Sequence, residues 1–187
     1  MNATRLLTHP VAGVFAIALL TLAVAPDSNR STVESSSERV SEINGVTLVD
    51  QHPFSGHVRE HFANGQLKRD ATYRDGKLHG RTRGWHENER PDYSRTYSAG
   101  LEAGTHEGWY ENGSRRFEYH FSKGMSEGVA KQWYRNGKPY TLFHFANGQE
   151  TGRQQMWDTE GKLRANYIIR EGRRYGLPGS VGCRGES

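Results

Sequence analysis

The sequence has little cysteine, few apolar residues and no long block of like charge. Cys183 is the single cysteine among 187 residues, which excludes a disulfide within the chain and a zinc site built from cysteines. Only 34% of the residues are hydrophobic, too few for one large core but enough for a repeat sheet in which aromatic residues supply the buried area. The formal net charge of +4 would suit an acidic partner or an anionic surface. Because both signs are interspersed, however, it indicates ordinary solubility charge, and no nucleic-acid partner is expected.

Recognisable catalytic motifs are also missing. No Ser-His-Asp or paired-carboxylate arrangement follows from the spacing, and Gly172–Gly182 does not lead from a strand into a helix as a phosphate loop does. His57 and His61 are four residues apart, with His52 nearby, but no carboxylate or cysteine stands at a ligand spacing. We expect no enzyme activity, no cofactor and no metal site. Metal handling by the histidines and Cys183 is the weakest alternative.

The sequence has one long apolar run. Val11–Ala25 is uncharged and follows Arg5. Its 15 residues are fewer than the roughly 20 of a membrane span and match the apolar region of a signal peptide, with a small-residue cleavage pattern at Ala23–Ala25. Pro26 disfavours cleavage, so residues 1–25 are predicted to be a signal peptide or an N-terminal anchor helix. We expect an exported protein, periplasmic or associated with the cell envelope.

Composition divides the rest of the chain into three parts. Residues 26–43 are rich in Ser and charge, which predicts a disordered linker. Residues 44–176 are predicted to fold, beginning with a turn at Asn44-Gly45 and a strand over residues 46–49. Residues 177–187 are predicted to form a C-terminal tail.

Glycine, in contrast, is abundant and periodic. One set recurs every 24 residues and is predicted to hold structural positions: Gly56, Gly80, Gly104, Gly128, Gly152 and Gly176. All four tryptophans fall on a second repeat position, also predicted to be structural: Trp85, Trp109, Trp133 and Trp157. A fixed period of this length indicates an array of supersecondary units.

Each repeat has the pattern of a β-hairpin. In residues 128–152, two apolar-aromatic runs are each followed by Asn-Gly, at Asn136-Gly137 and Asn147-Gly148, and Asn-Gly between such runs is a strong hairpin signal. Aromatic residues two positions apart, such as Phe143 and Phe145, have the period of a strand. We therefore predict an all-β fold: an elongated, twisted antiparallel β-meander of five 24-residue hairpin repeats.

The unit Gly-x-x-x-Trp-Tyr-x-Asn-Gly, followed by an alternating aromatic strand, resembles the MORN-repeat variant. More specifically it resembles bacterial YwqK-type antitoxin proteins, and residues 104–128 and 128–152 match best. The resemblance implies an antiparallel hairpin array with a binding role and no catalytic residues. It implies a protein partner such as a toxin, a scaffolding role, or membrane association. The alternative function is a module that binds envelope lipid or glycan.

The column next to the tryptophans is the candidate partner-binding site. Tyr110 and Tyr134 follow Trp109 and Trp133, and adjacent strand residues point to opposite faces. A single-layer sheet cannot cover both faces, so one aromatic row is expected to be exposed. The predicted partner-binding residues are Tyr110, Tyr134, Lys131 and Arg135.

Overall fold

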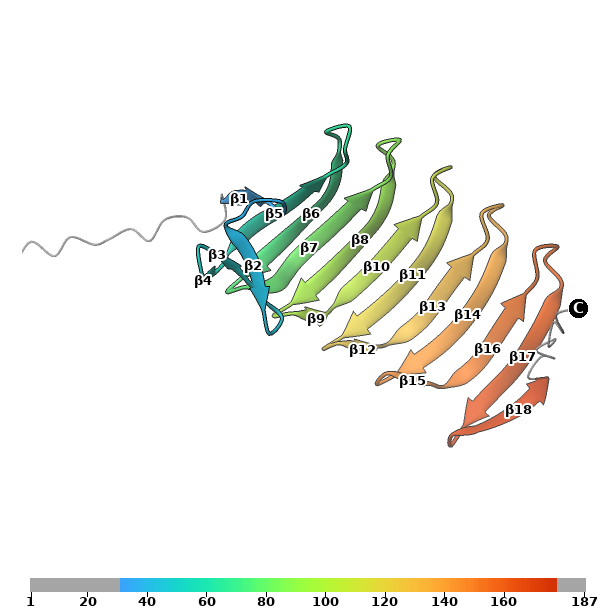
Figure 1. The fold of residues 1–187 in the computed structure, drawn as a ribbon. Coiled ribbons are helices and arrows are strands. Elements are labelled where there is room, and N and C mark those ends of the chain that lie inside the picture. The colour runs from blue at the N-terminus through green and yellow to red at the C-terminus, as the bar shows by residue number, and fades with distance from the viewer. Residues whose placement is uncertain (1–30, 178–187) are drawn as a thin grey trace, which may run out of the picture.

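The computed structural model describes residues 31–177. This part of the chain is all-β, with no helix, and none of it could therefore cross a membrane as an apolar helix. Figure 1 shows one long sheet in a single layer, along which hairpins follow one another from the N-terminal to the C-terminal end. The predicted signal or anchor helix of residues 1–25 lies outside the described residues, as does the predicted tail from residue 178 onward.

Residues 31–177 form eighteen strands. The N-terminal strands are β1 (Thr32–Glu34), β2 (Val40–Ile43), β3 (Val46–Val49) and β4 (His52–Pro53). The long strands of the five hairpins are β5 (Gly56–His61), β6 (Leu67–Arg74), β7 (Lys77–Trp85), β8 (Pro91–Ser98), β10 (Gly104–Trp109), β11 (Arg115–Ser122), β13 (Gly128–Trp133), β14 (Pro139–Ala146), β16 (Gly152–Trp157) and β17 (Leu163–Arg170). The remaining strands are β9 (Leu101–Glu102), β12 (Met125–Ser126), β15 (Gln149–Glu150) and β18 (Arg173–Leu177).

The large sheet is antiparallel except at its N-terminal edge. Its order is β1-β5-β6-β7-β8-β10-β11-β13-β14-β16-β17-β18, with β9, β12 and β15 paired at its side. β1 pairs with β5 in the parallel direction, so the sheet is mixed. Short connections explain the antiparallel majority, because a tight turn can join only antiparallel neighbours.

The structure corrects the predicted disordered linker of residues 26–43 over residues 31–43. Within residues 31–43, β1 lies on β5, and β2 pairs with β3 in a separate three-stranded sheet, β2-β3-β4. This small sheet is tied to the turn after β6, where the Thr47 N–H donates to the Gly76 carbonyl at 2.8 Å. Composition misled the prediction because β1 and β2 pair through main-chain groups, which need few apolar side chains.

The Asn-Gly turns close the hairpins as expected from their chemistry. In three repeats the Asn Oδ1 accepts the N–H two residues later, at 3.0 Å or 3.1 Å, from Gln66, Ser114 or Lys138. The repeat glycines predicted to be structural all have positive φ, between 62° and 149°. Glycine adopts this region without the Cβ clash that other residues incur.

The turns are also linked to one another along the array. The Nδ2 of Asn88, Asn112 and Asn136 donates to a carbonyl in the next turn, 23 residues later, at 2.9–3.2 Å. A single Asn side chain therefore closes its own turn and holds the neighbouring one. This second bond is a repeat-to-repeat contact of the kind that stabilises linear arrays.

The two faces of the sheet differ in chemistry. Cross-strand partners share a face, and β10 and β11 pair Gly104 with Phe121, His106 with Tyr119, and Gly108 with Phe117. The other face carries polar pairs such as Glu107 with Glu118. We call these the aromatic face and the polar face.

Each tryptophan ends its strand at a bulge. The register shifts between the tryptophan and the residue before it, at Trp85, Trp109, Trp133 and Trp157. All four tryptophans are half-buried. The extra residue of a bulge disturbs the strict alternation of side chains, which affects the residues that follow the tryptophan.

Candidate functional site

Aromatic side chains gather on the aromatic face over β11, β13 and β14 and at the adjoining turns. We call this set the aromatic surface, and each of its members is half-buried: Tyr110, Phe117, Tyr119, Phe121, Trp133, Tyr140, Phe143 and Phe145. The Phe117 and Tyr119 rings stack with centroids 4.9 Å apart. No second layer covers this face within the part of the chain that the structure describes. Partly exposed aromatic residues in one patch are typical of interaction sites.

The first hollow of this surface lies over Ala130 on β13. It has a volume of about 220 Å³, and its lining includes Tyr119 and Phe121 on one side and Phe143 and Phe145 on the other. We call it the Ala130 slot. Apolar walls with a few polar groups are typical of ligand sites.

The second hollow adjoins the first. It has a volume of about 310 Å³ and is lined by Tyr110, Arg116, Phe117, Tyr119, Gln132, Trp133 and Tyr140. We call it the Tyr110 hollow. Tyr119 and Gln132 line both hollows, and the Gln132 amide donates to the Tyr119 hydroxyl. This hydrogen-bonded pair therefore separates two adjacent depressions on one surface.

The predicted site residues Tyr110 and Tyr134 have a structural role. Each hydroxyl donates to the backbone carbonyl of the next repeat's tryptophan, Tyr110 to Trp133 at 2.8 Å and Tyr134 to Trp157 at 2.9 Å. Partial burial raises the pKa of the Tyr134 phenol. Each tyrosine therefore links its own turn to the next repeat, and its predicted role in partner binding stays a prediction.

The side-chain alternation used for these tyrosines does not apply to them. β10 ends at Trp109 and β13 ends at Trp133, so each tyrosine is the first residue of a turn. Tyr110 and Trp133 line the same hollow and do not lie on opposite faces. Only Tyr110 of the two tyrosines lines this hollow, whereas the Tyr134 ring packs against Tyr140 at 4.8 Å.

The predicted cations Lys131 and Arg135 are separated from each other. The Lys131 ammonium lies 3.3 Å from the Glu118 carboxylate on the polar face. Burial opposes ionisation of Glu118, but Lys131 and Arg115 hold its pKa below the usual range. Arg135 stacks over the Tyr110 ring at 5.7 Å. The four predicted residues therefore do not form one site, although Tyr110 and Arg135 are neighbours.

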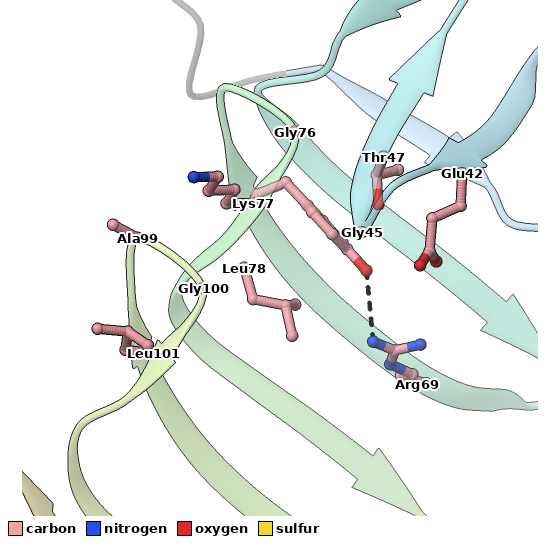
Figure 2. Close-up of a pocket in the computed structure, with 11 residues that line it drawn as sticks. Glu42, Gly45, Thr47, Arg69, Gly76, Lys77, Leu78, Ala99, Gly100 and Leu101 are labelled. Carbon is pink, nitrogen blue, oxygen red and sulfur yellow. Dashed lines mark hydrogen bonds between the residues drawn. The ribbon is translucent and has the colours of Figure 1, made fainter. Parts of the chain in front are cut away.

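A larger cavity lies at the N-terminal end of the array (Figure 2). Its volume is about 400 Å³, and it lies between the small sheet and the turns after β6 and β8. Glu42, Arg69 and Lys77 bring charges of both signs to its lining, and Arg69 donates to the Tyr73 hydroxyl at 3.4 Å. With mixed charges and much turn backbone in its wall, this cavity is a weaker candidate than the aromatic surface.

The histidines are distributed among separate partners. His57 contacts Asp70 at 2.9 Å and His61 contacts Glu34 at 2.8 Å. Among residues 31–177, no group of three or more His, Cys, Asp or Glu side chains could hold a metal ion. Cys183 lies outside this range.

Sequence reasoning missed the Ala130 slot because its defining feature is a small residue. The corresponding positions of the five repeats are Val58, Thr82, His106, Ala130 and Gln154. Aligning this column would have shown that Ala130 is its smallest member. Without knowledge of which face the column occupies, that signal could not be interpreted.

Two segments of the chain match the MORN repeat variant, at residues 55–75 and 126–147. The second segment runs from the end of β12 through β14 and so includes much of the aromatic surface. MORN repeats are in general motifs that bind proteins or membranes. No curated protein matches the chain.

Proposed function

We propose that this protein is a non-catalytic binding protein that docks a protein partner on its aromatic surface. The observation that carries the proposal is the pair of adjoining hollows, which place eight half-buried aromatic residues on one face. Aromatic residues are enriched at protein interfaces because they bury large areas and their polar groups hydrogen-bond at the rim.

The shape of the surface favours an extended peptide segment as the docking element. The two hollows lie side by side across the Tyr119–Gln132 pair, so two side chains of one segment could be anchored together. A few anchors in pockets supply most of the free energy in protein interfaces.

The resemblance to YwqK-type antitoxins favours a toxin as the partner. The apolar run Val11–Ala25 favours an encounter outside the cytoplasm, in the periplasm or at the cell envelope. Both statements are part of the proposal.

A displayed random-peptide library selected against the purified protein tests the proposal, followed by affinity measurements on variants. Phe143→Ala removes a ring from the aromatic face, whereas Leu142→Ala changes the preceding residue of β14, on the polar face. We expect Phe143→Ala to lower the affinity for selected peptides at least tenfold, as the loss of an anchor does. Leu142→Ala should leave this affinity unchanged. Equal effects of the two changes would overturn the proposal, as would binding to anionic lipid vesicles with no peptide bound.

A further inference from the structure

The slots that flank the Ala130 slot are filled by the protein's own side chains. In the preceding repeat the His106 ring lies between Tyr97 and Phe121, with centroid distances of 5.5 Å and 4.6 Å. In the following repeat the Gln154 side chain is fully buried, with 0% exposure. His106, Ala130 and Gln154 hold the same repeat position, 24 residues apart.

Both filling side chains donate a hydrogen bond to an equivalent backbone carbonyl. His106 Nε2 lies 2.8 Å from the Thr96 carbonyl, and Gln154 Nε2 donates to the His144 carbonyl at 3.0 Å. Each accepting carbonyl is ten residues before the side chain that reaches it. These two repeats therefore share one arrangement, in which a side chain fills the slot and directs an N–H at this carbonyl.

The Ala130 slot has the same walls and carbonyl but no filling side chain. The equivalent carbonyl is that of His120, which accepts the Glu127 N–H at 2.9 Å, as Thr96 accepts that of Ala103 and His144 that of Thr151. A carbonyl oxygen has a second lone pair, and the methyl group of Ala130 cannot donate to it. The walls are Phe121 and Phe145, which correspond to Tyr97 and Phe121 around His106.

The dimensions of the Ala130 slot suit a flat ring larger than imidazole. Its walls stand on β11 and β14, two strand spacings or about 9.6 Å apart, and a ring in contact with two flat faces needs about 7–8 Å. An apolar cavity of about 150 Å³ holds benzene, and the volume here is about 220 Å³. Two fused rings therefore fit.

The charge distribution around the slot favours a ligand that donates a hydrogen bond. Aromatic faces are electron-rich, the His120 carbonyl is an acceptor, and the Glu127 carboxylate stands at the rim, where its Oε2 accepts the Asn147 N–H at 2.9 Å. An N–H edge complements these groups. A buried tryptophan ring needs such a partner for its N–H.

We propose that the Ala130 slot binds the indole ring of a tryptophan side chain on the protein partner, with the indole N–H donated to the His120 carbonyl; this rests on the function proposed above. Phe121 and Phe145 flank the ring. The bound tryptophan occupies the place that His106 and Gln154 take in the neighbouring repeats.

Calorimetric titration of the full chain with indole and with indene tests the hydrogen bond, because indene has the same shape without the N–H. We expect indole to bind about two- to tenfold more tightly, the range for a neutral hydrogen bond. N-acetyl-tryptophanamide should bind at least as well as indole. Equal affinity for indole and indene would overturn the proposal. Binding of indole with no binding of N-acetyl-tryptophanamide would also overturn it, because the natural ligand would then be a small molecule.

Variants that fill the slot test its location. Ala130→His and Ala130→Gln copy the residues of the adjacent repeats, and each should reduce indole affinity at least tenfold. Val129→His adds the same ring on the polar face of β13 and should leave affinity within twofold. Two filling variants are used in case one of them misfolds, and thermal unfolding shows whether each variant is folded. Undiminished binding to both filled variants, or no binding to the unaltered chain, would overturn the proposal.

The outcomes separate this proposal from the broader one. If indole does not bind but peptides still lose affinity with Phe143→Ala, the tryptophan slot is wrong and the docking surface stands. If indole binds the slot but no peptide uses the aromatic face, both the partner docking and the partner's tryptophan are wrong, and only a site for a small ring remains.

Discussion

At the residue scale, backbone conformation distinguishes the repeats. The fourth turn residue is Gly65, Gly113, Gly137 or Gly161 in four repeats and Glu89 in the second. Glu89 has φ of 63°, in the left-handed region where a Cβ is costly. Because the other four repeats have Gly at this position, the 24-residue period marks Glu89 as the exception.

Replacing Glu89 with Gly is expected to stabilise the protein. Relief of the left-handed conformation contributes on the order of 1 kcal/mol, partly offset by the greater freedom of Gly in the unfolded chain. Denaturant unfolding should show a higher midpoint. Glu87→Gly, at an exposed position of the same turn without positive φ, should lower the midpoint. An unchanged midpoint for Glu89→Gly would mean that the turn bears no strain.

A second residue-scale prediction concerns Tyr134. Tyr134→Phe removes the hydroxyl that donates to the Trp157 carbonyl at 2.9 Å and should cost about 1 kcal/mol of unfolding free energy. Tyr175→Phe is the control: Tyr175 is exposed, so this change should lower the unfolding free energy very little.

The same phenol predicts a pH dependence. Its pKa is raised in the folded protein, so its contribution is fully present below the unfolded pKa of about 10 and is lost as pH rises through the folded pKa. Tyr134→Phe should therefore make unfolding free energy fall less steeply above pH about 10. An identical alkaline profile would contradict the burial of this hydroxyl.

At the element scale, the hairpins could be predicted and the links between them could not. Asn136-Gly137 predicts a turn because local chemistry decides it. The Nδ2 bond from Asn136 to Thr159 crosses 23 residues and depends on the stacking of one turn on the next. Likewise, the alternation rule predicts the face of Phe143 within a strand but fails for Tyr134, which lies beyond a bulge.

The Asn ladder gives a prediction at this scale. Asn112→Asp keeps the acceptor that closes its turn but replaces the amide that donates to the Arg135 carbonyl at 3.1 Å. The unfolding free energy should fall by about 1–2 kcal/mol, since a donor is lost and a carboxylate faces a carbonyl. Asn64→Asp is the matched control, because the Asn64 amide donates to Gln66 within its own turn. Equal losses in the two variants would show that the ladder does not couple repeats.

At the scale of the whole molecule, additional strands cap the N-terminal end of the array. β1 covers the edge of β5, and the His61–Glu34 contact at 2.8 Å joins the two strands. Terminal units commonly cap repeat arrays, whose stability comes from neighbour contacts. The composition of residues 31–43 could not reveal this cap, because its pairing depends on the edge that β5 presents.

Truncation tests the cap. A chain starting at residue 31 keeps β1 and β2, whereas one starting at residue 44 loses both and exposes the β5 edge. We expect the shorter chain to unfold at a lower temperature and to associate more readily, as open edges do. Equal thermal midpoints and equal monomer fractions would show that β1 and β2 add nothing to the array.

The most direct test of the proposed docking surface is hydroxyl-radical footprinting with and without a selected peptide, because it reads both faces of the same strands. We predict that the peptide protects Phe117, Tyr119 and Phe143 on the aromatic face, while Val129 and Leu142 on the polar face keep their reactivity. Protection of Val129 and Leu142 with unchanged Phe143 would contradict docking on the aromatic surface.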